Sequence, residues 1–550
     1  MPPALFLIAL LALSRAAAAP AGGVRADIRV GFDGYVVPDV WIPLAVRLES
    51  DRAVTATLEV MTTRTRPPGT ERVRLSVHLV PGTPYPVTIP IVVHDVHAPL
   101  TVRLVTGDRV LGQWRVVVPP TRLVDAVVVA VSRRPVGLQQ LLGEESRVRA
   151  AYLAEEDLPA RWELYEGVAA VVLRDLDERR LVPAQGRALA DYVATGGRLY
   201  LAAPPPADIL SHHVLRPLLA AAPAPVPSGA ERLHPWGRGG LVVMPTDPFR
   251  SDLSSDAAAV WARTLAEVRG PGLVDRTLLE LLPRALRLSV WVQALIVLTL
   301  GLYLLSLRWL ARLLQSGHLG VVVALVIFTS FTLLTAGLNT VARRGTAGLI
   351  QATVAQGLIN QEIALVESAG RVIVPRGGAF RLESGAGGLI RATAAADTVL
   401  TLSAVVRFEG RADGSLPVRA AALLPLPIRG TYRETPEGVE VNIRNRTGRL
   451  LRGGFVVLGG RVQALPPVGA EAHLRLTPLD WREAPAPDAA RGPADRLLAW
   501  AIGRLRGDAI LSATVSLVAW LDDDRGVLRW AGLPAAPLLL VFPLSPAEAP

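Results

Sequence analysis

Two uncharged apolar runs in the middle of the chain set the strongest limit on its architecture. They cover residues 288–307 and 319–341, joined by the basic segment RWLARLLQSGH. Each run has about the 20 residues that a helix needs to cross the hydrocarbon core of a bilayer. We therefore predict two transmembrane helices, which makes the lipid bilayer the first partner. Neither run contains Asp, Glu, His, Lys or Arg, so the pair is expected to anchor domains and not to form a pore alone.

The amino terminus has the pattern of an export signal. Residues 1–23 contain an apolar core, Leu5–Leu13, followed by the small residues Ala16–Ala19, an order that suits a signal peptidase. Arginines flank both apolar runs on both sides, so the positive-inside rule does not set the orientation. The signal peptide sets it instead. It predicts a cell-membrane protein with most of the chain extracytoplasmic and 308–317 in the cytoplasm.

Composition limits the classes of partner and chemistry. The chain has 550 residues, a net charge of +10 and no cysteine, which excludes disulfides, cysteine-ligated zinc and a thiol nucleophile. Every basic residue is arginine, a bias typical of GC-rich coding, so the charge is weak evidence for nucleic acid and we predict no nucleic-acid partner. An arginine-rich exported surface suits anionic lipid headgroups or anionic wall polymers.

Two stretches show the period-two alternation of half-buried strands. Residues 24–120 contain short alternating runs separated by Pro and Gly, which predicts a β-sandwich of the immunoglobulin-like kind. Residues 345–480 return to this pattern and are predicted to form a second β-rich domain, with a turn at Asn445–Gly448. Residues 481–550 are predicted to hold a linker, a short helix at 494–505 and terminal strands at 514–521 and 538–542.

The region 121–275 has a different period. Continuous apolar runs, typical of strands buried on both faces, alternate with helical stretches at 181–194 and 255–268. Gly196–Gly197 is expected to close the first helix. This alternation predicts an α/β doubly wound domain with helices on both faces of a parallel sheet. The buried strands are expected at 123–131, 168–173, 199–202 and 240–244.

Within this region the segments VAAVVLRDL, QGRALADYVATGGRLYLA and GRGGLVVMPTDPF resemble class I glutamine amidotransferase-like domains. Catalytic members of that family carry a nucleophile, usually Cys, on a sharp turn after a strand. Here the 199–202 strand is followed by Ala203 and three prolines, which remove backbone donors. The resemblance therefore implies a catalytically inactive version, with no catalytic residue and no cofactor.

Three aspartates are the candidate ligand-facing residues. Asp175 and Asp177 follow the 168–173 strand, and Asp247 follows the 240–244 strand. Open α/β sheets place ligands at the carboxyl ends of their strands. The alternative for the first two is a helix N-cap, with Glu178 in the first turn. Pro248, beside Asp247, favours an ordinary turn there.

No metal site is predicted. His94 and His97 would point to opposite faces of a strand, and their spacing matches no zinc pattern. His212-His213 are adjacent, and adjacent histidines rarely bind one ion. The aspartates at 522–524 lack the spacing of a calcium loop.

Three functional hypotheses follow. As a whole the chain resembles uncharacterised bacterial membrane proteins with an extracytoplasmic amidotransferase-like domain. The first hypothesis is a non-enzymatic binding or scaffolding protein of the cell envelope, with other envelope proteins as partners. The second is an accessory subunit of an envelope ABC-type transport system. The third, disfavoured by the missing nucleophile, is a hydrolase using Asp175, Asp177 or Asp247.

Overall fold

The computed structural model describes residues 23–243, Leu298 and residues 348–546. Inside these ranges the described chain is interrupted at 66–67, 96, 133–136, 143–146, 175–179, 202–231, 359–361, 386, 395, 404, 437, 459–460, 477–480, 484–492, 508–514, 522–527 and 531–537. The predicted signal peptide and 255–268 helix lie outside the described residues.

The amino-terminal region forms seven strands in two sheets, where the period-two pattern predicted strands. A turn at Phe32 and Tyr35 precedes β2. It requires Gly31, which has a φ of +71° and whose missing Cβ would lie 1.9 Å from the Tyr35 carbonyl oxygen. The strands are β1 (Val24–Val30), β2 (Trp41–Ser50), β3 (Val54–Thr65), β4 (Pro68–Leu79), β5 (Tyr85–Val92), β6 (Leu100–Thr106) and β7 (Arg109–Val116). β1, β2 and β5 make a three-stranded antiparallel sheet.

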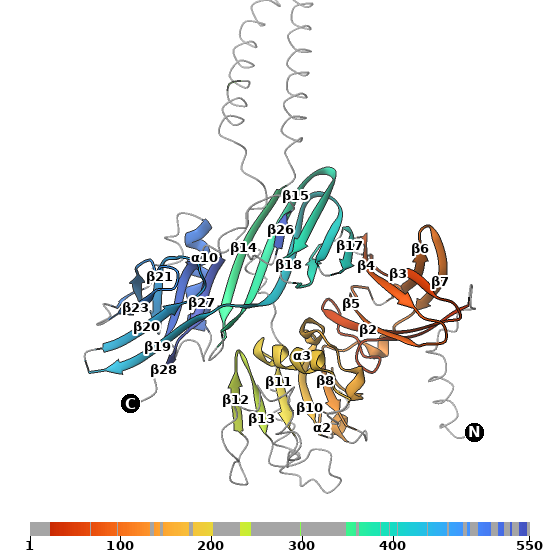
Figure 1. The fold of residues 1–550 in the computed structure, drawn as a ribbon, viewed down its shortest axis with the longest axis horizontal. Helices are drawn as coiled ribbons and strands as arrows, with labels where there is room; N and C mark the ends of the chain where they lie inside the picture. The colour runs from red at the N-terminus through yellow and green to blue at the C-terminus, as the bar shows by residue number, and fades with distance from the viewer. Residues whose placement is uncertain are drawn as a thin grey trace, which may run out of the picture.

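The other four strands belong to a much larger sheet that carries on into the carboxy-terminal region. At its centre are β14 (Gly348–Gly357), β15 (Ile363–Ser384) and β18 (Val406–Pro425), which run across the middle of Figure 1. β17 (Asp397–Leu402) pairs with β18 on one side and, in parallel, with β4 on the other, matching Thr398 with Glu71. The seam between β4 and β17 therefore joins the predicted sandwich to the predicted second β-rich region.

The rest of the large sheet comes from the end of the chain. Its 15 strands follow the order β24-β22-β21-β25-β27-β14-β15-β18-β17-β4-β3-β6-β7, with β16 on β18 and β26 on β15. A helix, α10 (Pro493–Gly507), packs against β25 and β27, where the sequence predicted a short helix. The remaining strands are β16 (Ile390–Ala392), β21 (Leu451–Leu458), β22 (Arg461–Leu465), β24 (Arg482–Glu483), β25 (Ser516–Leu521), β26 (Leu528–Trp530) and β27 (Leu538–Pro543).

A smaller sheet of four strands lies beside this end of the large one, at the left of Figure 1. Its order is β23-β20-β19-β28, with bounds β19 (Ile428–Thr435), β20 (Gly438–Asn445), β23 (His473–Leu476) and β28 (Ser545–Pro546). The predicted turn after β20 is present. Asn445 is fully buried, and its side-chain oxygen accepts the Thr447 amide at 3.1 Å, while Gly448 has a φ of +71°.

The region predicted to be doubly wound holds a six-stranded sheet, order β12-β13-β11-β10-β8-β9, in which β12 and β13 are antiparallel and the other pairs parallel. The strands are β8 (Ala126–Val131), β9 (Val148–Leu153), β10 (Val168–Leu173), β11 (Arg198–Leu201), β12 (Arg232–Trp236) and β13 (Gly239–Val243). The predicted 181–194 helix is α3 (Pro183–Ala194), and the Gly197 amide donates to the Tyr192 carbonyl at 2.9 Å as it ends.

The predicted fold class needs correction. A doubly wound domain takes a crossover helix at each step between parallel strands. Here the described helices are α3 and the five-residue α2 (Leu138–Leu142), and the connection from β9 to β10 runs through 3-10 turns at Glu155–Asp157 (η2) and Trp162–Tyr165 (η3). The part of the chain that the structure describes is dominated by strands in four sheets, not by an amidotransferase-like doubly wound fold.

The predicted fold class also included two transmembrane helices, and this part of it needs correction too. Residues 288–307 and 319–341 lie outside the described residues, apart from Leu298. Among the residues that are described, no helix is long and apolar enough to cross a membrane. The architecture that the structure supports is therefore β-rich, and its main hydrophobic core, which contains residues from Val24 to Leu544, unites strands from both ends of the chain.

Candidate functional site

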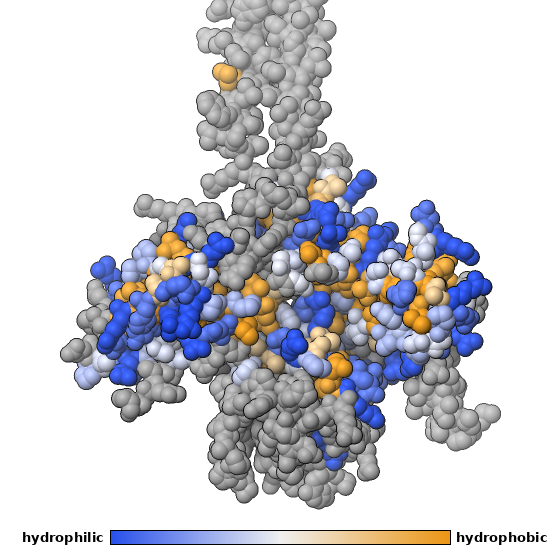
Figure 2. Space-filling view, in the orientation of Figure 1, coloured by the Kyte–Doolittle hydropathy of each residue, from blue (hydrophilic) through white to orange (hydrophobic). Residues whose placement is uncertain are grey.

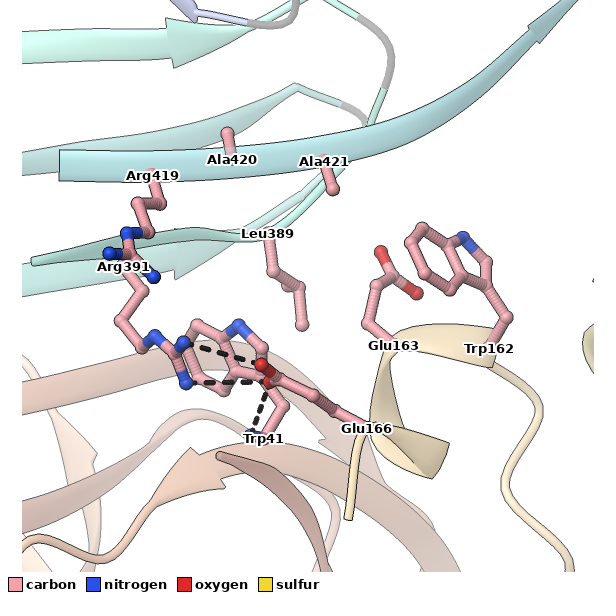
Figure 3. A pocket seen from close by; sticks show the side chains of 9 residues that line it. All are labelled: Trp41, Trp162, Glu163, Glu166, Leu389, Arg391, Arg419, Ala420 and Ala421. Carbon is pink, nitrogen blue, oxygen red and sulfur yellow. Dashed lines mark hydrogen bonds and ion pairs between the residues drawn. The ribbon is translucent and has the colours of Figure 1, made fainter. Parts of the chain in front are cut away.

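Three parts of the fold meet at one buried ion pair, which we call the junction. Arg391 Nη2 lies 3.3 Å from Glu166 Oε1, and Arg391 Nη1 lies 3.4 Å from Glu166 Oε2. The same Oε2 accepts the backbone amide of Trp41 at 3.0 Å. Figure 3 shows these contacts converging on Glu166 from two sides. A forked arginine–carboxylate pair fixes orientation as well as distance, so the junction sets how the three parts sit against one another.

Each junction residue comes from a different sheet region. Trp41 begins β2, Glu166 follows η3 beside the six-stranded sheet, and Arg391 lies in β16 on the large sheet. The side chains of Arg391 and Glu166 are 14% and 8% exposed. At this burial each charge depends on the other, because an unpaired charge in a protein interior is strongly destabilising.

The cavity around the junction is small. It has a volume of about 30 Å³ and is bordered by Trp162, Glu163, Leu389 and Arg419 in addition to the junction residues. That volume corresponds to about one water molecule, and small-molecule pockets usually enclose several hundred cubic ångströms. The chemistry of this site is therefore best suited to holding protein segments together.

A second polar cluster adjoins the junction through Asp39. The Asp39 carbonyl accepts Arg391 Nη1 at 2.5 Å, and its carboxylate lies 2.6 Å from His94 Nδ1. The other ring nitrogen of His94 lies 2.9 Å from Glu71 Oε1. The His94 side chain is 4% exposed. Asp39 holds a left-handed backbone, with φ at +58°, which places its carbonyl and carboxylate toward different partners.

His94 lies near the β4–β17 seam, because its partner Glu71 belongs to β4. Burial lowers the pKa of His94, but its hydrogen bonds to Asp39 and Glu71 outweigh this, and its pKa lies above the ordinary value. Arg64 opposes them, with Nη2 at 2.7 Å and 3.1 Å from the two ring nitrogens. The hydrogen bond from His94 correspondingly lowers the pKa of Asp39. His94 thus connects the two sheets of the amino-terminal region through Asp39, which precedes β2, and Glu71 in β4.

A third polar feature lies between α3, η3 and the turn before β16. Arg161 Nη2 donates to Glu163 Oε1 and to the Gly387 carbonyl, both at 2.7 Å. The groove beside these groups has a volume of about 280 Å³ and includes Asp191 and Arg187. Burial, together with the nearby charge of Glu163, raises the pKa of Asp191 to about 6. This groove is a second place where the six-stranded sheet region meets the large sheet.

The residues singled out from the sequence have separate outcomes. Asp175, Asp177, Asp247, His212-His213 and the aspartates at 522–524 lie outside the described residues. Contrary to the prediction of opposite strand faces, His94 and His97 do not lie on a strand, because β5 ends at Val92 and the chain bends at His94. His97 is exposed, whereas the His94 side chain is buried between two carboxylates. Among the described residues, no group of three or more His, Cys, Asp or Glu side chains could hold a metal ion.

Glu166, Arg391 and Asp39 were missed by sequence reasoning. Arg391 and Glu166 are 225 residues apart, and neither belongs to a recognisable motif. The one available signal was His94 itself, which the sequence analysis considered only as a metal ligand together with His97.

Comparison with known proteins adds one finding. Residues 23–117 match a family model described as Domain of unknown function (DUF8726). No curated protein matches the chain. The matched segment spans β1–β7 and contains Asp39, Glu71 and His94, whereas Glu166 and Arg391 lie beyond it.

Proposed function

We propose that this chain is a non-enzymatic binding or scaffolding protein of the bacterial cell envelope. The observation that carries the proposal is the junction, where a buried arginine and carboxylate use their hydrogen bonds to fix three parts of the fold. A scaffold needs this kind of rigidity, because binding surfaces on different sheets engage one assembly only at a constant separation.

The other polar clusters support the same proposal. The bonds of Arg161 connect the η3 segment to the Gly387 turn, and His94 connects the sheet of β5 to the sheet of β4. In each case charged side chains join regions that are distant in sequence. An accessory role in an envelope ABC-type transport system is one form of scaffolding, and it differs in naming an ATPase and a permease as the partners.

The experiment is recovery of the full-length chain, tagged and at native level, from cross-linked cells, followed by quantitative mass spectrometry. Wild type is compared with Arg391→Met, which removes the junction charge. Arg391→Lys keeps the charge without the fork, and Arg25→Met changes an exposed arginine on β1.

If the chain is a scaffold, the same envelope proteins should be recovered in a fixed ratio to the tagged chain for wild type and for Arg25→Met. The amount recovered should fall several-fold with Arg391→Met and by less with Arg391→Lys. An ATPase and a permease among them would specify the transport form. Wild type recovered without any partner in fixed ratio would overturn the proposal.

A further inference from the structure

The four-stranded sheet presents one polar face to the outside. Register places the side chains in rows across three strands, with Arg433 opposite Glu440, Thr431 opposite Asn442, and Asn442 opposite Arg475. We call this surface the polar face. Its eight outward residues are Arg429, Thr431, Arg433, Glu440, Asn442, Arg444, His473 and Arg475.

Alternation along the strands explains why this face is polar. The intervening residues Val441 and Ile443 are fully buried and pack in the main hydrophobic core. Because neighbouring side chains on a strand point to opposite sides, Glu440, Asn442 and Arg444 must point away from that core. Figure 2 shows hydrophilic residues gathered over this part of the molecule, at the left where Figure 1 labels β19 and β20.

The polar face is hollowed at its centre. The recess has a volume of about 240 Å³ and is bordered by Thr431, Tyr432, Arg433, Glu440, Asn442 and Arg475. Within it the side-chain oxygen of Asn442 is buried and has no hydrogen-bond partner. A buried acceptor without a donor is costly. This oxygen therefore indicates that a donor group from outside the chain completes the site.

The charge of the polar face is strongly positive. It holds four arginines against the single carboxylate of Glu440, to which Arg475 is ion-paired. Arg429 is also paired, with Glu362 at 2.5 Å. Among the residues that the structure describes, Arg433 and Arg444 have no ion-paired carboxylate. Arginine binds carboxylate, sulfate and phosphate groups through its planar fork.

From these observations we propose that the polar face binds an anionic polysaccharide. Arg433 and Arg475 lie on the two outer of three adjacent strands, about 10 Å apart across the sheet. Each of them binds one anionic group of the same polysaccharide. Asn442 and Thr431 lie between them and hydrogen-bond the sugar hydroxyls. The proposal rests on the binding role proposed above, to which it adds a ligand class.

Two other polyanions fit less well. An anionic membrane surface favours basic residues interleaved with apolar side chains that insert between lipids, and none of the eight outward residues has an apolar side chain. Single-stranded nucleic acid favours a platform of aromatic rings on which successive bases stack. The polar face offers one outward ring, the imidazole of His473, which does not border the recess, and Tyr432 borders the recess from the core side and packs against the main core. A polysaccharide requires neither feature.

The test measures binding of the full-length chain to polygalacturonate, which offers carboxylates, and to dextran sulfate, which offers sulfates. Neutral dextran and phosphatidylglycerol vesicles are the comparison probes. The double variant Arg433→Gln/Arg475→Gln removes both gripping side chains. Arg25→Gln is the matched control, because Arg25 is an exposed strand arginine outside the polar face.

Wild type is expected to bind one or both anionic glycans, with an affinity that falls as salt rises. The affinity of the double variant should be at least about tenfold lower than that of wild type. Arg25→Gln should change affinity less than about twofold. Glu440→Gln removes the competing carboxylate and should bind more tightly, a gain that misfolding does not produce. Which glycan binds better distinguishes carboxylate from sulfate as the recognised group.

Three outcomes would overturn the proposal: no glycan binding by wild type, an equal loss in Arg25→Gln, or binding to vesicles alone. The scaffolding proposal is judged separately, because the double variant leaves the junction intact and should still recover the wild-type set of envelope proteins. Loss of glycan binding with those proteins retained would thus separate the two proposals.

Discussion

The junction and the polar face contain the same pair of residue types in opposite settings. Arg391 and Glu166 are 14% and 8% exposed, whereas Arg475 and Glu440 are 65% and 12% exposed. The first pair is closed to solvent and connects three parts of the fold. The second leaves its arginine open on a strand face. The difference teaches that an arginine–carboxylate pair determines architecture when both members are buried and can serve recognition when the arginine stays accessible.

The largest effect is expected from breaking the buried pair. Arg391→Met leaves Glu166 as an unpaired buried charge and should lower the free energy of unfolding by about 3–5 kcal/mol. Arg391→Lys keeps the charge but loses part of the fork, so it should cost about 1.5 kcal/mol. Urea denaturation gives both values. A cost below about 1 kcal/mol for Arg391→Met would remove the distinction between the two pairs.

The contribution of His94 to stability is expected to depend on pH. His94→Leu removes the donor to Asp39 and Glu71 and should cost about 2–3 kcal/mol at pH 6. The folded pKa of His94 is raised, so its contribution is full below the unfolded value near 6.5 and is lost as pH rises through the folded pKa.

Denaturation at a series of pH values checks this expectation. The gap between wild type and His94→Leu should narrow above neutral pH. Arg64 acts on the same ring, so Arg64→Gln should widen the pH range over which the gap persists. A gap that stays constant from about pH 5 to pH 9, a range that brackets the titration of histidine, would contradict a pH-dependent contribution from His94.

Removing the charge of Asp191 is expected to stabilise the fold, whereas removing a member of a buried ion pair destabilises it. The reason is that burial disfavours the charged form of Asp191. The folded pKa of Asp191 is about 6, above the ordinary value of 3.8 for this side chain, so the stability of the folded state is highest below pH 3.8 and falls as pH rises to about 6. Asp191→Asn should therefore raise the free energy of unfolding by about 1–2 kcal/mol at pH 8. The gain should vanish in acid, which thermal unfolding at two pH values can show.

The smallest effect is expected at the polar face. Glu440→Gln breaks the pair with Arg475, but that arginine is 65% exposed, so stability should change by less than about 0.5 kcal/mol. Arg475→Gln should change the free energy of unfolding by a similarly small amount. A loss as large as that of Arg391→Met would mean that the polar face supports the fold and is not free to bind a ligand.

Much of the local structure was predictable from the sequence. Period-two alternation identified the strands of the amino-terminal region, and Gly196–Gly197 marked where α3 ends. These features depend on neighbouring residues alone.

The long hairpin of β15 and β18 shows where local reasoning ended. The sequence predicted short strands separated by Pro and Gly in this region, yet β15 has 22 residues and runs through Pro375, and β18 has 20 residues and runs through Gly414. The paired strands absorb the irregularity as a register shift between Val374 and Gly378. A breaker is tolerated when the partner strand is long enough to resume the ladder on its far side.

By itself, the sequence determined which residues alternate between core and solvent, where α3 ends, and which chemistry is excluded by the lack of cysteine. Only the tertiary structure decided that β4 pairs with β17, that Arg391 meets Glu166, and that four arginines share one outward face. The physical reason is that alternation specifies which side of a strand is buried but not which strand lies beside it. That choice depends on contacts between residues hundreds of positions apart, and these contacts create both the junction and the polar face.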